Sequence, residues 1–172
     1  DALLLVIQAF SKESCGRLAQ ASKAWKAATA ARRSEWRLIA RVEWESGFRE
    51  DTLEELTLPV GLSTIGDGAF CGCRNLHSIV LPKTVTSIQI AAFAGCCALR
   101  EIELPSGITS IDHSAFGHCT ALRKVALPDG LTTVEDSTFY GCSALEEVKL
   151  PAGLTTIGVC AFYNCKSLKT IE

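Results

Sequence analysis

The chain has 172 residues, of which 48% are hydrophobic and 21% charged, with a net charge of −2. This composition excludes a disordered chain, and no apolar run reaches the roughly 18 residues that a membrane span needs. Residues 1–50 hold nine Lys and Arg against six Asp and Glu, a surplus too small and too dispersed to predict a nucleic-acid-binding surface.

Residues 1–47 are predicted to form three short helices. The segment contains no proline and all three tryptophans of the chain, and its apolar residues recur at helical spacing. Such helices ahead of a repeat array are compatible with a cap that shields the apolar end of the first coil. The three apolar stripes are Leu3, Val6, Ile7 and Phe10, then Leu18, Ala21 and Trp25, and then Trp36, Ile39 and Ala40.

The order of residues in this segment also resembles an F-box. The stretch RLAQASKAW, residues 17–25, is similar to the second-helix signature of that motif, although Ser14-Cys15 replaces its aspartate-leucine and its opening leucine-proline is absent before Asp1. The resemblance implies that the helices bind a Skp-type adaptor of a cullin ubiquitin ligase. It places the adaptor contacts at Leu3, Leu4, Val6, Ile7, Phe10, Leu18 and Trp25.

From about residue 51 the sequence repeats with a period of 23 residues. One unit, residues 122–142, reads LRKVALPDGLTTVEDSTFYGC, and all five prolines, five of the seven phenylalanines and five of the nine cysteines occupy fixed positions in it. A fixed period of this length predicts a solenoid, in which stacked coils bury one continuous core. The conserved positions are Pro59, Pro82, Pro105, Pro128 and Pro151; Phe70, Phe93, Phe116, Phe139 and Phe162; and Cys73, Cys96, Cys119, Cys142 and Cys165.

The letters of one unit predict the path of a coil. Residues 122–127 form a strand that Pro128 ends, Asp129-Gly130 form a turn, and residues 131–134 form a second short extended piece. The residue before each repeated cysteine is one that tolerates positive φ, which predicts a left-handed turn there. These residues are Gly72, Gly95, His118, Gly141 and Asn164.

The unit resembles the leucine-rich repeats of the BspA-like family over about residues 51–172. The predicted fold is therefore a solenoid of about five 23-residue coils, mainly β with short turns, spanning residues 50–172 and preceded by a small all-α domain or cap at residues 1–49. The sequence stops at Glu172, before the next leucine-proline and without an atypical capping unit, so we expect the array to be truncated at this end.

The cysteines and histidines do not predict catalysis or a cofactor. Cys71, Cys97 and Cys160 occupy three different repeat positions, which argues against a zinc site, and the repeated cysteines are expected to be small buried residues with weak S–H donors. His118-Cys119 and His77 lack a carboxylate placed by spacing to orient them. The odd count of nine cysteines favours reduced thiols and hence a cytoplasmic or nuclear protein.

The outward positions of the first strand are the candidate target-binding surface. These positions vary from unit to unit while the core positions do not, although neighbours such as Lys124 and Glu147 are equally well interpreted as cross-strand ion pairs. A second exposed set, from Ser63-Thr64 to Thr155-Thr156, is uniformly Ser or Thr and suits the pleat of a sheet. The candidate target-binding residues are His77, Arg100, Glu101, Glu103, Arg123, Lys124, Glu146, Glu147 and Lys149.

Two functions follow from these patterns, and both are non-catalytic. In the first, the repeats bind a protein target and the F-box-like helices bind the Skp-type adaptor, so the chain is a substrate receptor of a ubiquitin ligase. In the alternative, the chain is a BspA-like surface, adhesion or general protein-interaction module, and its helices are only a cap.

Overall fold

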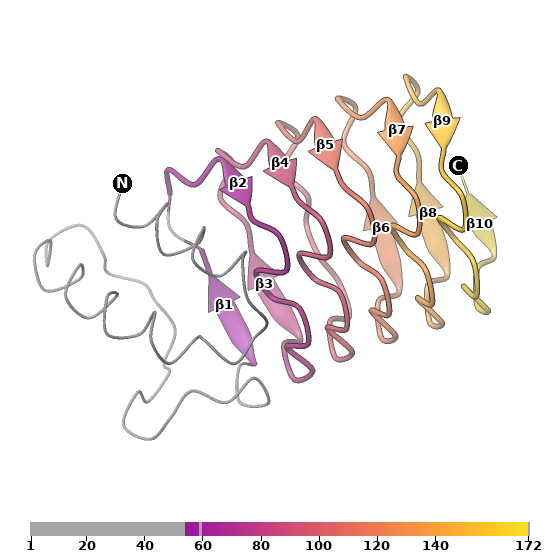
Figure 1. The fold of residues 1–172 in the computed structure, drawn as a ribbon, viewed down its shortest axis with the longest axis horizontal. Helices are drawn as coiled ribbons and strands as arrows, with labels where there is room; N and C mark the ends of the chain where they lie inside the picture. The colour runs from indigo at the N-terminus through magenta and orange to yellow at the C-terminus, as the bar shows by residue number, and fades with distance from the viewer. Residues whose placement is uncertain (1–53, 59, 172) are drawn as a thin grey trace, which may run out of the picture.

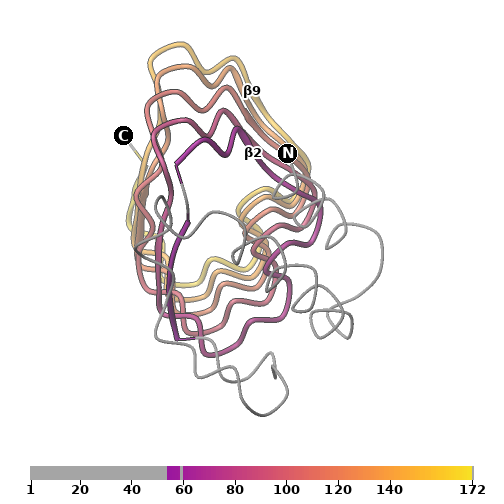
Figure 2. The ribbon, with the colours of Figure 1, turned by 90° about the vertical axis from the view of Figure 1, so that its left-hand side faces the viewer.

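The computed structural model describes residues 54–58 and 60–171, which form a solenoid of stacked coils (Figure 1). Seen along the stacking axis, successive coils trace nearly the same outline (Figure 2), as the fixed period predicts. The predicted helices of residues 1–47 lie outside the described residues. Within residues 54–58 and 60–171 we find no helix long and apolar enough to cross a bilayer.

The first side of the solenoid is a set of short parallel strands, one coil apart. Pairs such as Glu55↔Ser78 and Lys124↔Glu147 fix the register at one repeat. The strands are β1 (Glu55–Thr57), β3 (Ser78–Val80), β6 (Lys124–Ala126), β8 (Glu147–Lys149) and β10 (Thr170–Ile171). They confirm the strand predicted in the repeat, and we call this side the strand face.

The strand face is interrupted at one coil, where the repeat pattern predicts a strand and the structure has none. Between β3 and β6 only an isolated bridge from Glu101 to Lys124 remains. The face therefore divides into a two-stranded sheet, β1-β3, and a three-stranded sheet, β10-β8-β6. Glu101 and Glu103 flank Ile102 in this coil, and glutamate is depleted in strands, although β1 and β8 also begin with glutamate.

The second side contains the shorter strands predicted from residues 131–134 and their equivalents. The proline turn that leads to them closes with the Leu131 amide donating to the Pro128 carbonyl at 3.1 Å. The uniform threonines reinforce the ladder, because the Thr155 hydroxyl donates to the Thr132 carbonyl of the preceding coil at 2.9 Å. These strands are β2 (Thr64–Ile65), β4 (Ser87–Ile88), β5 (Ser110–Ile111), β7 (Thr133–Val134) and β9 (Thr156–Ile157).

The third side, which we call the turn edge, consists of residues 68–73 and their equivalents in later coils. Its amides alternate between two kinds of acceptor. The Phe70 and Gly72 amides donate to the next coil, each at 2.7 Å, to the Ala92 and Ala94 carbonyls, whereas the Cys71 amide donates within its own coil. The between-coil backbone bonds of this edge therefore all run in one direction, from the N–H of one coil to the C=O of the next.

Two residues in each turn are left-handed, and the sequence predicts one of them. Gly72, Gly95, His118, Gly141 and Asn164 all have positive φ, which confirms the predicted turn. The second column, Gly68, Ala91, Ser114, Ser137 and Cys160, also has positive φ although Ala, Ser and Cys rarely adopt it. The surrounding bonds impose this conformation, since the Ala91 amide donates to the His113 carbonyl at 3.0 Å.

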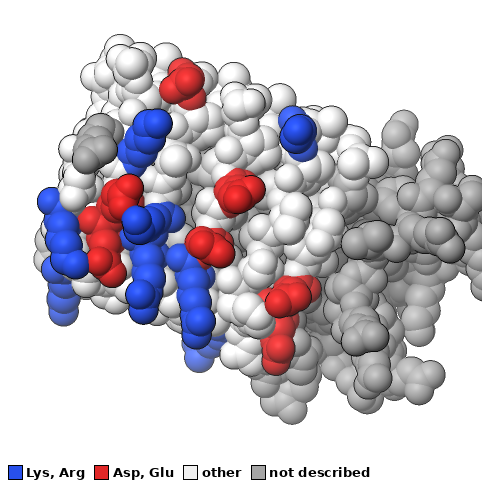
Figure 3. Space-filling view, turned by 180° about the vertical axis from the view of Figure 1, so that it is seen from behind, with Lys and Arg blue, Asp and Glu red and all other residues white. Residues whose placement is uncertain are grey.

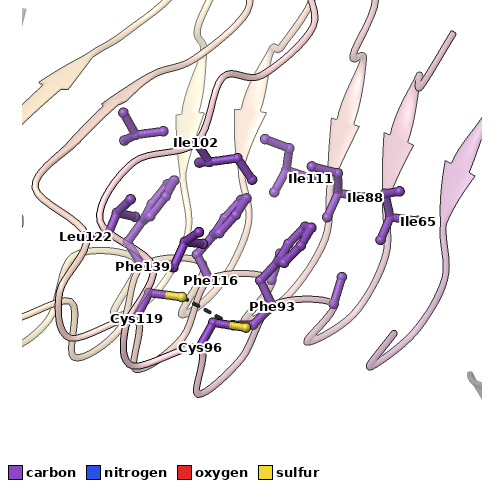
Figure 4. Packing of buried hydrophobic residues seen from close by; sticks show 14 of the residues in the cluster. Ile65, Ile88, Phe93, Cys96, Ile102, Ile111, Phe116, Cys119, Leu122 and Phe139 are labelled. Atoms are coloured by element: carbon purple, nitrogen blue, oxygen red, sulfur yellow. Dashed lines mark hydrogen bonds between the residues drawn. The ribbon is translucent and has the colours of Figure 1, made fainter. Parts of the chain in front are cut away.

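The core is built from columns of identical side chains. The rings of Phe93, Phe116 and Phe139 are fully buried and lie parallel to one another (Figure 4), with centroids 5.3 and 5.5 Å apart. The columns that flank them include Ile65, Ile88 and Ile111, which are at most 3% exposed. No single coil encloses its own apolar side chains, so each coil depends on its neighbours for burial.

The cysteine column lies directly beside the phenylalanine column and has the structural role predicted for it. The Cys119 thiol donates to the Phe93 carbonyl at 3.2 Å, and that carbonyl also accepts the Cys96 amide at 3.1 Å. The Cys142 thiol donates in the same way to the Phe116 carbonyl at 3.1 Å. Cys119 and Cys142 thus each join their coil to the preceding one, and both side chains are fully buried.

These buried thiols predict a loss of stability at alkaline pH. Burial raises the pKa of Cys142 from 9.0 to about 12, and burial likewise raises the pKa of Cys96 and Cys119. Because the unfolded chain releases these protons first, the stabilisation is complete below pH 9.0 and is lost progressively as the pH rises toward about 12. We expect the melting temperature, followed by circular dichroism, to fall across this window, and less steeply in Cys142→Ala.

The control for this experiment is Cys160→Ala, because the Cys160 side chain is exposed. It should leave the pH dependence of the melting temperature unchanged. Equal slopes in the parent chain and in Cys142→Ala would show that the cysteine column does not contribute to alkaline unfolding.

The last described coil leaves its core columns partly open. Ile157 is 51% exposed and Ile171 49%, whereas Ile111, in the same column as Ile157, is 3% exposed. Phe162 and Leu168 are half-buried and pack against the core from one side only. The core columns therefore extend through this coil, on whose far side no described residue lies.

Candidate interaction surface

The strand face presents three rows of outward side chains that run across the coils. In β6 the Val125 side chain is buried, while Lys124 and Ala126 on either side of it are exposed. The coils repeat this alternation, so equivalent outward residues line up one coil apart. The nine predicted target-binding residues all lie in these rows: His77, Arg100, Arg123 and Glu146; Glu101, Lys124 and Glu147; and Glu103 and Lys149.

Charged residues of both signs gather over this face (Figure 3), and those of the later coils neutralise one another. Lys124 Nζ lies 2.6 Å from Glu147 Oε2, and Lys169 Nζ lies 2.7 Å from Glu146 Oε2. The hydrogen bond from Lys169 lowers the pKa of Glu146, and that from Lys124 to Glu147 raises the pKa of Lys124. The predicted cross-strand ion pair between Lys124 and Glu147 is therefore confirmed, although such exposed pairs stabilise a fold only slightly.

The centre of the face is not neutralised in this way. Arg100, Glu101 and Glu103 form no salt bridge with any residue that the structure describes. Arg123 is close enough to Glu146 to contribute to the low pKa of that carboxyl, but Glu146 is already bonded to Lys169. Free charge is thus concentrated where the strand ladder is interrupted.

Comparison with known proteins identifies the repeat. The family model for the BspA type leucine rich repeat region matches residues 45–171 in six copies. The chain belongs to the BspA-type leucine-rich repeat family. None of the curated proteins compared with the sequence matches it.

Three solved structures illustrate the likeness of this BspA-type chain to bacterial proteins. A leucine rich cell surface protein from Faecalibacterium prausnitzii A2-165 is 36% identical over 73% of this chain and 33% of its own, with a TM-score of 0.69. The leucine-rich repeat protein TpLRR of T. pallidum is 35% identical over 69% of this chain and 58% of its own, with a TM-score of 0.66. A leucine-rich repeat protein from Eubacterium ventriosum is 30% identical over 70% of this chain and 39% of its own, with a TM-score of 0.58.

The BspA-type array also has a second surface feature, which the sequence analysis missed. On the turn edge, the rings of Tyr140 and Tyr163 stack at 5.4 Å, and the His118 ring meets Tyr140 edge-on at 5.1 Å. Gly141 makes room for this histidine, because a Cβ atom there would lie 2.8 Å from His118 Nδ1. The signal was present in the sequence, since both tyrosines of the chain occupy one repeat position.

The described part of the BspA-type array does not assemble a catalytic constellation from the residues considered in the sequence. His118 is exposed against Tyr140, whereas the adjacent Cys119 is buried and donates to the Phe93 carbonyl. Within residues 54–58 and 60–171 no three His, Cys, Asp or Glu side chains are grouped to hold a metal ion. The adaptor contacts Leu3, Leu4, Val6, Ile7, Phe10, Leu18 and Trp25 lie outside the described residues.

Proposed function

We propose that this chain is a non-catalytic protein-interaction module that binds a polypeptide on the strand face of its BspA-type array. The observation that supports this most directly is the contrast between the two sides of each strand. Val125 and Val148 repeat an invariant apolar core, whereas the outward residues above them change sign and size from coil to coil. Constant packing beneath a variable surface is what a recognition scaffold requires.

The stacked coils make this surface rigid before a partner arrives. Between-coil bonds on three sides and the stacked phenylalanine rings hold the strands at a spacing of about 4.8 Å. Binding a partner therefore costs little conformational entropy in this chain. The affinity depends instead on how well the charges of the partner match those of the outward rows. A segment that crosses several coils would gain contacts from each of them.

The setting that we favour for this binding is a cell surface. One of the similar structures is described as a leucine rich cell surface protein, although this chain spans only about a third of it. The opposite expectation, a cytoplasmic or nuclear location, was based on the odd number of cysteines. Cys96, Cys119 and Cys142 are buried and bonded to backbone carbonyls, so their presence is explained by packing in any compartment.

The ubiquitin-ligase role remains a separate prediction for residues 1–47. The family match begins at residue 45, so it supports the repeats and leaves the F-box resemblance untested. Saturable binding to a purified Skp-type adaptor that is lost in the Ile7→Asp/Phe10→Asp double variant would favour the receptor role over a cap.

Selection from a random peptide library tests the proposed function without knowledge of the partner. The full chain is immobilised, and enriched peptides are measured against a strand-face variant, Arg123→Ala/Lys149→Ala, and a turn-edge variant, Tyr163→Ala. We expect peptides that bind the parent chain and the turn-edge variant but lose affinity for the strand-face variant. Failure to enrich any peptide, or loss of binding only in the turn-edge variant, would contradict the proposed use of the strand face.

A further inference from the structure

The outward charges of the strand face differ between its centre and its later coils. In the later coils, Lys124 and Lys169 each lie within 2.7 Å of a glutamate one coil away. At the centre, Arg100, Glu101 and Glu103 form no salt bridge with any described residue, and all three are exposed. The centre therefore offers charges that a partner can use without breaking an existing ion pair.

Arg100 and Arg123 are direct neighbours in one row. The Arg123 amide donates to the Arg100 carbonyl at 3.0 Å, which places their Cα atoms about 4.8 Å apart across the ladder. Like charges directly opposite each other are unfavourable, and Glu146, the carboxyl whose pKa Arg123 helps to lower, is already engaged by Lys169. A carboxylate placed between the two guanidinium groups would relieve this repulsion and accept paired hydrogen bonds.

Acidic and apolar side chains adjoin this arginine pair. Glu101 lies opposite Lys124 in the isolated bridge, but Lys124 turns toward Glu147 of the following coil. Glu103 stands in the same row as Val80, whose side chain is 56% exposed. The centre thus places two arginines and two glutamates, none of which forms a salt bridge with a described residue, beside an exposed apolar side chain.

We propose that Arg100 and Arg123, together with Glu101 and Glu103, form a charge-complementary site for an extended polypeptide that carries an acidic residue close to a basic one. The arginines receive the carboxylate, and the glutamates receive the basic group. This proposal rests on the proposed function, since it specifies the partner of the same face. A uniform polyanion such as a sulfated polysaccharide fits less well, because Glu101 and Glu103 repel it.

The spacing of the strand indicates a simple recognition element. Alternate side chains of an extended peptide project to the same side about 7 Å apart. When an acidic and a basic residue of the peptide are separated by one residue, both side chains therefore point to the same side. The acidic side chain can then contact the arginines while the basic side chain contacts the neighbouring glutamates. A peptide of repeated Glu-Ser-Lys triplets presents this spacing on both of its faces.

The test is an NMR titration of the full, ¹⁵N-labelled chain with that triplet peptide, with its Gln-Ser-Gln counterpart, and with heparin, at about 50 mM salt. We expect the triplet peptide to shift the amides of residues 100–103 and 123–124. The dissociation constant should rise about tenfold in Arg100→Gln/Arg123→Gln and also in Glu101→Gln/Glu103→Gln. The control, Lys83→Gln/Lys166→Gln, removes two exposed charges outside the strand-face rows and should bind like the parent chain.

The outcomes separate this inference from the broader proposal. Equal affinity for the charged and neutral peptides, unchanged affinity in the arginine variant, or tighter binding of heparin at the same amides would overturn the inference. The proposed function would survive that result if the library still yields peptides that need the strand face. It would fail with the inference only if no peptide of any composition depended on that face.

Discussion

Phe116→Ala is expected to destabilise the array by about 3–5 kcal/mol, which is enough to separate the coils on its two sides. The ring is fully buried and is stacked between Phe93 and Phe139, at 5.3 and 5.5 Å. Its removal leaves a cavity in the middle of the continuous core, and the neighbouring coils cannot close it because their own bonded ladders fix their spacing. Thermal denaturation should show a melting temperature lower by roughly 8–15 °C.

The matched control for this variant is Tyr163→Ala. Tyr163 also stacks on an aromatic ring, at 5.4 Å from Tyr140, but its side chain is 60% exposed. We expect it to lose less than about 1 kcal/mol, because stacking without burial removes little apolar surface from water. Equal melting temperatures for Phe116→Ala and the parent chain would show that the phenylalanine column is not the core.

Gly158→Ala is expected to displace the last described coil, at a cost of about 1–3 kcal/mol. A Cβ atom at Gly158 would lie 2.5 Å from the Asp136 amide nitrogen and 2.7 Å from the Glu135 carbonyl carbon. The clash is with backbone, and the Gly158 amide already donates to the Val134 carbonyl at 2.7 Å. The coil can therefore accommodate the methyl group only by giving up this bond.

Amide hydrogen exchange can measure the loss of protection in the coil that contains Gly158. Amides of residues 156–165 should lose protection in Gly158→Ala, while those of residues 85–120 keep theirs, since stability in a solenoid is shared mainly between neighbours. Gly153→Ala is the control, because a Cβ atom at Gly153 meets nothing within 4 Å and the residue lies in the same coil. If both alanine variants exchange alike, backbone crowding at Gly158 does not limit the position of the coil.

Much of the fold is predictable from the sequence because the repeat forces identical residues into identical places. The column that contains His118 and Asn164 is recognisable as left-handed, since those residues tolerate positive φ. Ala91 and Ser114 are equally left-handed but give no such signal, because inter-coil bonds rather than their own preferences hold them there. Local sequence therefore predicts a conformation only where the residue itself prefers it.

The face on which the candidate residues lie follows from the sequence, but their ion pairs do not. The outward rows follow from the pleat, so all nine residues were placed on one face. Lys124 has a glutamate in each neighbouring coil, Glu101 and Glu147, and it forms an ion pair with Glu147. This preference depends on side-chain geometry across three coils, which the repeat period does not encode. The missing strand at residues 101–103 was not predictable either, since β1 and β8 begin with glutamate and still form ladders.

The one-way direction of the backbone bonds on the turn edge makes the two sides of each coil along the stacking axis chemically unlike. Every coil there offers N–H groups forward and C=O groups backward, so the amides of Cys160, Phe162 and Asn164 in the last described coil present donors along the axis. If two copies of this surface met face to face, the N–H groups of one would lie against the N–H groups of the other. The turn edge would then contribute no hydrogen bonds to the contact. The turn edge thus discourages symmetric end-to-end association, the route by which exposed sheet edges commonly aggregate.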